Sequence, residues 1–194
     1  MLVTVFDFSS WMERKNPEAA LAAFARLRRA VPDAVLVVKT TRGRRARGEA
    51  RRLAALLRRS PGVVWIDGVW PNADVEALLR GAEAFVSLHR AEGFGRNIAK
   101  ALLLGTRVVV TDWSGNTEMG AEPGYIGVPA SRLLPISDDD YVLGEGQHWA
   151  EPDARAALRG MRAALEKRVP KPGRAPLRFG RQRLARRIGR AMGA

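Results

Sequence analysis

Five short apolar runs divide the chain at regular intervals, and stretches with apolar residues at helical spacing separate them. The runs contain little polar alternation, which is typical of strands buried on both faces. They span residues 2–8, 34–38, 63–66, 84–88 and 107–111. The helical stretches span residues 17–31, 49–58, 72–79, 97–104 and 154–165, the first with Asn16 as its cap. Residues 115–134 show no period, so we expect irregular structure there.

Regular alternation of buried strands and helices predicts an α/β fold with a doubly wound, Rossmann-like parallel sheet. Ligands of such sheets bind beyond the carboxyl ends of the strands. The loops after Phe8, Val38, Ile66, Leu88 and Thr111 are therefore expected to converge on one crevice.

A glycine-rich turn follows the fourth apolar run and opens the fourth predicted helix. Its residues are Glu92-Gly93-Phe94-Gly95. The first N–H groups of a helix have no partner inside the helix, and together with the helix dipole they favour phosphate. The glycines let a ligand approach the backbone, and the Glu92 carboxylate suits sugar hydroxyls as an acceptor. This combination indicates a nucleotide-sugar site.

Composition excludes several other kinds of site. The chain has no cysteine and only two histidines, so disulfides, thiolate metal sites and His-based metal clusters are not expected. The apolar start is too short to span a membrane and lacks a basic leader, which favours a cytoplasmic protein.

The net charge of +13 gathers at the end of the chain. Residues 167–194 contain ten basic and no acidic residues, and we treat the other +3 as spread over the preceding 166 residues. We therefore predict a nucleotide-sugar-binding α/β domain over residues 1–168, and a basic linker with a C-terminal helix over residues 169–194.

Five segments in order resemble the donor-binding, C-terminal half of retaining glycosyltransferases of family 4, which have the GT-B architecture. The segments are residues 6–10, 14–17, 89–95, 105–116 and 146–153. The resemblance implies one half of a GT-B protein that binds a nucleoside-diphosphate sugar. We expect no cofactor besides the donor substrate. No Asp-x-Asp metal motif of the other glycosyltransferase architecture stands out, because the aspartates at residues 138–140 fall in a late loop, so we expect no metal requirement.

The resemblance assigns roles to individual residues. Glu92 is the candidate catalytic residue, which would stabilise positive charge on the anomeric carbon. Lys15, assisted by Arg14, would neutralise the diphosphate. The backbone of Gly93, Phe94 and Gly95 would surround the sugar and phosphates.

Three other positions have two interpretations each. Lys39 is either a ligand contact or a charge at the end of a strand. Asn97 either contacts the ligand or bonds at the start of its helix, and His89 either touches the ligand or is a hydrogen-bonded histidine at a strand end.

Two departures from the family pattern concern activity. Lys100 stands where the family has a second glutamate, which accepts from the ribose hydroxyls. A lysine can only donate, but its side chain could still bind the substrate through a ribose oxygen or a phosphate. No acceptor-binding half precedes Met1, so we expect a separate acceptor-binding domain or subunit.

Three hypotheses follow. The first is the donor half of a glycosyltransferase, which transfers a hexose to a hydroxyl acceptor with retention. The second is a nucleotide-sugar-binding module without catalysis. In the third, the basic tail contacts an anionic membrane surface; nucleic acid is less expected because Phe179 is the tail's one aromatic residue.

Overall fold

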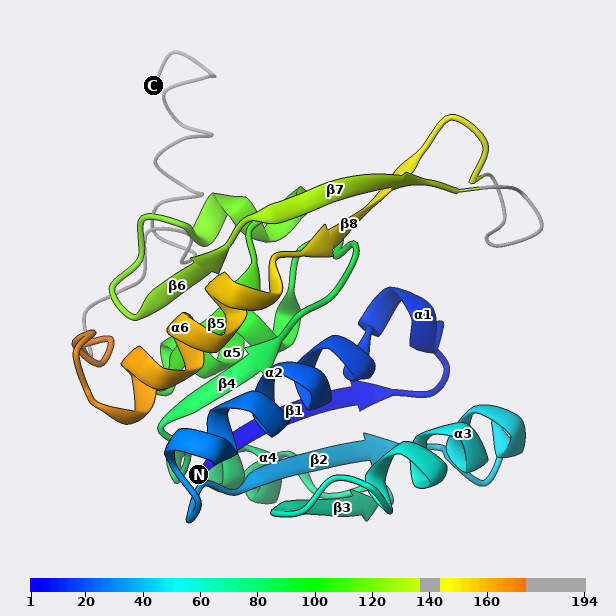
Figure 1. Cartoon of the computed structure of the whole chain (residues 1–194), viewed down its shortest axis with the longest axis horizontal. Helices are drawn as coiled ribbons and strands as arrows, with labels where there is room; N and C mark the ends of the chain where they lie inside the picture. The colour runs from blue at the N-terminus through cyan, green and yellow to red at the C-terminus, as the bar shows by residue number, and fades with distance from the viewer. Residues whose placement is uncertain (137–143, 174–194) are drawn as a thin grey trace, which may run out of the picture.

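Six parallel strands form one sheet in the order β3-β2-β1-β4-β5-β6 (Figure 1). The structure is a computed structural model that describes residues 1–136 and 144–173. The strands are β1 (Leu2–Asp7), β2 (Leu36–Thr41), β3 (Val63–Asp67), β4 (Ala84–Ser87), β5 (Arg107–Thr111) and β6 (Tyr125–Val128). The expected doubly wound α/β fold is confirmed. Strand order reverses between β1 and β4, which is where such sheets bind their ligands.

Helices cover both faces of the sheet. On one face lie α2 (Pro17–Ala30), α3 (Arg47–Leu57) and α6 (Ala154–Leu165), whose buried members include Phe24, Leu53 and Met161. On the other face lie α4 (Asn72–Arg80) and α5 (Arg96–Leu103), packed through Leu79 and Leu102. Because successive strand residues point to opposite faces and both faces are covered, the central strands are largely apolar.

The start of α2 follows the sequence prediction closely. Asn16 is its cap, in the left-handed conformation with φ 48°, and its side chain accepts from the Ala19 N–H at 3.3 Å. Pro17 takes the first helical position, where a missing N–H costs nothing. One feature was missed: a single helical turn, α1 (Met12–Lys15), precedes this cap.

The expectation of irregular structure over residues 115–134 is wrong. That stretch contains most of the 3₁₀ helix η1 (Ser114–Met119), strand β6 and most of β7 (Ala130–Pro135). Strand β7 pairs antiparallel with β8 (His148–Pro152), and the resulting hairpin extends away from the main sheet. The sequence pattern did not predict these strands, because β6 has only four residues and β7 is exposed along much of its length and has no apolar face.

Two sequence predictions lie outside the described residues, namely the aspartates at 138–140 and the C-terminal helix within 174–194. Part of the expected linker is described, and Arg107 donates to the carbonyl of Val169. The described helices include none that is both long and apolar enough to cross a membrane.

We predict that Asn16→Ala lowers the free energy of unfolding by about 1–2 kcal/mol. Alanine removes the helix cap and disfavours the left-handed backbone. Asn16→Gly also removes the cap but tolerates a positive φ, so it should cost less. Urea denaturation of both variants measures the difference. Equal stability of both variants and the unmodified protein would contradict this account of the α2 start.

Candidate functional site

The glycine-rich turn lies between β4 and α5, at the carboxyl edge of the sheet. Gly95 precedes α5 with φ +81°, and no side chain caps this helix, so its first N–H groups have no side-chain acceptor at the N-cap position. The positive φ favours glycine at this position, and a Cβ there would also lie 2.9 Å from Ile98 Cδ1.

The loop after β5 holds the glycine turn in place. The Gly115 N–H donates to the Glu92 carbonyl at 3.0 Å, and the Glu92 N–H donates to the Ser114 hydroxyl at 2.8 Å. A Cβ on Gly115 would come within 1.4 Å of the Gly93 carbonyl oxygen. The two loops are therefore in backbone contact, and any side chain at position 115 would separate them.

An ion pair joins the end of α1 to this turn. Lys15 Nζ lies 2.5 Å from Glu92 Oε2, and Arg14 Nη1 lies 3.7 Å from the same oxygen. Arg14 also donates to the Ala91 carbonyl at 2.9 Å. The side chains of Lys15 and Glu92 are 17% and 18% exposed, so the pair is shielded but remains open to a ligand.

Burial and mutual attraction oppose each other in this pair. Burial would raise the pKa of Glu92, but Lys15 and Arg14 more than offset it and hold that pKa below its ordinary value. Burial lowers the pKa of Lys15, and Glu92 offsets only part of that effect. The result is a pair in which each member stabilises the charge of the other against the effect of burial.

Arg90 is a functional candidate that sequence patterns did not reveal. Its N–H donates to the Arg14 carbonyl at 2.8 Å, and its guanidinium donates to the Glu13 carbonyl at 2.9 Å and to Glu151 at 2.8 Å. Its own carbonyl accepts from the Ala150 N–H at 2.9 Å. Arg90 thus fastens α1, the glycine turn and β8 together. No spacing pattern reveals a pairing across 61 positions.

His89 is fully buried within a hydrogen-bond network. Its Nε2 donates to Asn116 Oδ1 at 2.9 Å, and its Nδ1 lies 3.1 Å from the Ser87 hydroxyl. Asn116 in turn donates to the Thr111 carbonyl and to Tyr125. Burial lowers the pKa of His89 below its ordinary value. These contacts match the hydrogen-bonded alternative and leave the ring no open side.

The other predicted contacts, Lys39, Asn97 and Lys100, each have a protein partner that is not part of the Lys15–Glu92 pair. Lys39 is 1% exposed, donates to the carbonyls of Thr40 and Gly68, and lies 4.8 Å from the centre of the Trp70 ring. Burial lowers the pKa of Lys39. Asn97 donates to the Val5 carbonyl at 3.2 Å, which ties α5 to β1.

Lys100 Nζ lies 3.9 Å from Glu76 Oε1, on the neighbouring helix α4. Of the remaining predicted contacts, Phe94 is 43% exposed at the tip of the turn, and Gly93 is exposed beside it.

A sequence model of the family "Glycosyl transferases group 1" matches residues 7–129, a stretch that includes both halves of the ion pair. The chain belongs to this family. Sequence comparison of this glycosyltransferase-family chain with curated proteins gives no match.

Solved structures share the fold of this glycosyltransferase-family chain at low sequence identity. The pneumococcal O-GlcNAc transferase GtfA, in complex with UDP and GlcNAc, aligns with a TM-score of 0.57, 15% identity, 87% of this chain and 29% of that one. A UDP-forming α,α-trehalose-phosphate synthase from Burkholderia xenovorans aligns with a TM-score of 0.58 and 14% identity. The alignment covers 84% of this chain and 36% of that one. WaaG, a glycosyltransferase involved in lipopolysaccharide biosynthesis, aligns with a TM-score of 0.54 and 17% identity. The alignment covers 85% of this chain and 38% of that one. The chain thus spans about a third of these GT-B proteins.

The described residues of this glycosyltransferase-family chain bring no three His, Cys, Asp or Glu side chains together in a metal-binding group. The arrangement that they do form is a paired cation and carboxylate beside an uncapped helix start. It can take up an anionic phosphate group and present a carboxylate to hydroxyls.

We predict that Glu92→Gln lowers the free energy of unfolding at pH 7 by about 1–3 kcal/mol, because it leaves a shielded Lys15 without its counter-charge. The pKa of Glu92 is lower in the folded protein than its ordinary value of 4.5. The charge of Glu92 therefore contributes fully to the free energy of unfolding above pH 4.5, and this contribution is lost as the pH falls through the lower folded-state pKa. The difference between variant and unmodified protein should therefore shrink below about pH 4.

Glu13→Gln is the matched control, since Glu13 pairs with the half-exposed Arg52. Chemical denaturation at a series of pH values should show a smaller and flatter effect for this control, below about 1 kcal/mol. A Glu92→Gln difference that is independent of pH would show that the ion pair is not its cause.

Proposed function

We propose that this chain is the donor-binding half of a retaining glycosyltransferase and that it binds a nucleoside-diphosphate sugar at the Lys15–Glu92 pair. The observation that carries the proposal is the position of this pair, beside the uncapped start of α5 and at the point where strand order reverses. The pneumococcal O-GlcNAc transferase, which shares this fold, was solved with UDP and GlcNAc, and this supports the same ligand class.

Donor binding requires the ion pair to exchange partners. In the free protein, the ammonium of Lys15 is neutralised by Glu92. A diphosphate carries more negative charge than one carboxylate and also accepts from the backbone N–H groups of the glycine turn. It therefore draws Lys15 away, with Arg14 contributing a second cation. Glu92 is then released to accept from the sugar hydroxyls.

The released carboxylate has a further role during transfer. The bond between the anomeric carbon and the diphosphate oxygen breaks, and the electron pair leaves with the diphosphate, where Lys15 stabilises the charge. Positive charge develops on the anomeric carbon, and Glu92 stabilises it. The acceptor hydroxyl forms the new bond on the same face of the sugar and loses its proton to the departing phosphate. The hydroxyl acceptor is held by a separate acceptor-binding domain or subunit, and neither cofactor nor metal takes part.

The second candidate function is nucleotide-sugar binding without transfer. Lys100 favours it, because this side chain faces Glu76 and supplies no acceptor for ribose hydroxyls. Supplying an acceptor-binding partner distinguishes the two: transfer of labelled sugar in its presence supports the enzyme, and donor binding that never leads to transfer supports the module.

Isothermal titration calorimetry with UDP and GDP tests the proposed site. Lys15→Ala should weaken diphosphate binding by about tenfold or more, because a charge-assisted contact is lost. Glu92→Gln should strengthen binding of the bare nucleoside diphosphate several-fold, because Lys15 no longer has to leave a carboxylate. The gain in affinity should be smaller for the corresponding nucleotide sugar, because its sugar hydroxyls lose the Glu92 carboxylate as an acceptor.

Arg52→Ala is the control, because it removes an exposed cation that pairs with Glu13 and Glu18 and lies outside the site. It should leave the dissociation constant within about twofold of the unmodified value. The proposal fails if none of these nucleotides binds, or if Lys15→Ala binds them as the unmodified protein does.

A further inference from the structure

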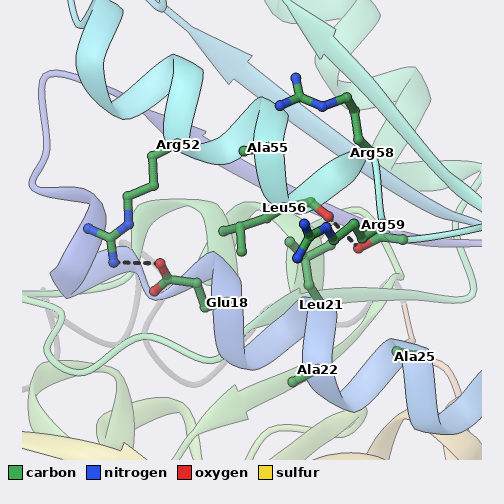
Figure 2. Close-up of a pocket in the computed structure, with 10 residues that line it drawn as sticks. Glu18, Leu21, Ala22, Ala25, Arg52, Ala55, Leu56, Arg58 and Arg59 are labelled. Carbon is green, nitrogen blue, oxygen red and sulfur yellow. Dashed lines mark hydrogen bonds and ion pairs between the residues drawn. The ribbon is translucent and has the colours of Figure 1, made fainter.

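A groove of about 700 Å³ lies between α2 and α3, away from the residues of the ion pair (Figure 2). The backbone of α2 packs closely along α6, whereas few backbone positions of α2 and α3 come close to each other, which leaves a groove above the side chains that join them. Its lining contains none of the residues proposed to bind the donor. The groove is therefore a feature that the proposed sugar-transfer chemistry does not explain.

The floor of the groove is apolar and made largely of small side chains. Ala22 and Ala25 come from α2 and Ala55 comes from α3, and all three are exposed. Leu21 and Leu56 lie beside them and reach down toward the core. Small side chains on two neighbouring helices allow a third helix to approach closely and pack its ridge into the groove between them.

The rim of the groove is basic. Arg52 lies at one end and already pairs with Glu13 and Glu18. Figure 2 shows the Arg52–Glu18 pair. Arg58 and Arg59 lie at the other end, and neither has a carboxylate partner among residues 1–136 and 144–173.

The surrounding segment is basic as well. Residues 42–59 hold eight arginines and one glutamate. Positive charge before residue 167 is therefore concentrated around α3, and our expectation that it is spread over the first 166 residues is wrong.

The apolar floor and the basic rim together indicate what kind of ligand the groove can bind. An occupant must bring an apolar stripe to the alanines and carboxylates to the arginines. The chain's own residues 169–194 are basic and would be repelled. A flat bilayer does not reach apolar atoms that lie between two helices, and nucleic acid would find no aromatic or base-reading group in this lining.

We propose that the α2–α3 groove binds an acidic amphipathic helix of a partner protein. The helix would pack its small and aliphatic residues on Ala22, Ala25 and Ala55. Its flanking glutamates or aspartates would pair with Arg58 and Arg59. The interaction uses a surface separate from the donor site and leaves the Lys15–Glu92 pair free.

The test uses the full chain and a fluorescein-labelled synthetic helix of about 18 residues, with a leucine and alanine stripe flanked by glutamates. Fluorescence anisotropy measures its affinity for the unmodified protein and for the double variant Arg58→Glu, Arg59→Glu. The matched control is Arg44→Glu, Arg45→Glu, which changes the net charge equally at two exposed arginines outside the groove. Circular dichroism melts confirm that each variant is folded.

The groove variant should bind the peptide about tenfold or more weakly, and the control should bind within about threefold of the unmodified protein. Ala25→Trp, which fills the floor without changing charge, should also weaken binding by about tenfold. Equal losses in groove and control variants would overturn the proposal, since they indicate unspecific attraction.

Two further outcomes would also overturn it. One is the absence of saturable peptide binding. The other is displacement of the peptide by phosphatidylglycerol vesicles or by single-stranded RNA, with equal displacement from the unmodified protein and from Ala25→Trp. The surface would then recognise charge alone.

Discussion

The contact between Lys15 and Glu92 is the constraint on which the architecture of the site depends. These residues lie 77 positions apart, yet their charged atoms are 2.5 Å apart because β1 and β4 are neighbours in the sheet. The short helix α1, which follows β1, supplies the cation, and the turn after β4 supplies the carboxylate. Two opposite charges in a shielded position are stable only as a pair, which makes the pair a natural place for an anionic ligand to compete.

Backbone contacts make this arrangement rigid. The loop after β5 touches the glycine turn so closely that Gly115 admits no side chain, and Arg90 links the turn to α1 and to β8 through four hydrogen bonds. Such preorganisation matters for electrostatic stabilisation, because charged groups that are already in position need no reorganisation when charge develops on a ligand. The hairpin of β7 and β8 is part of this support through Glu151 and Ala150, although it lies beyond the residues that the family model matches.

Much of the fold was predictable because its central strands are buried on both faces and therefore appear as continuous apolar runs. The hairpin and α1 were not, since β7 has no apolar face and α1 is a single turn. At the site, the convergence of loops at the carboxyl edge follows from topology, and it places Lys15 beside Glu92. Side-chain partners do not follow from topology. Lys39 lies near the end of β2 and Asn97 lies in the first turn of α5, and the side-chain nitrogen of each donates to a backbone carbonyl. The Arg90–Glu151 pair joins segments that no spacing relates.

The central claim is that a diphosphate and Glu92 compete for Lys15. The most direct measurement is a carbon-13 NMR titration of the Glu92 carboxyl, with and without saturating UDP. In the free protein its pKa should lie below the ordinary 4.5. With UDP bound it should rise, because the carboxylate loses its ammonium partner and gains an anionic neighbour. A pKa that stays unchanged when UDP is bound would contradict the exchange of partners.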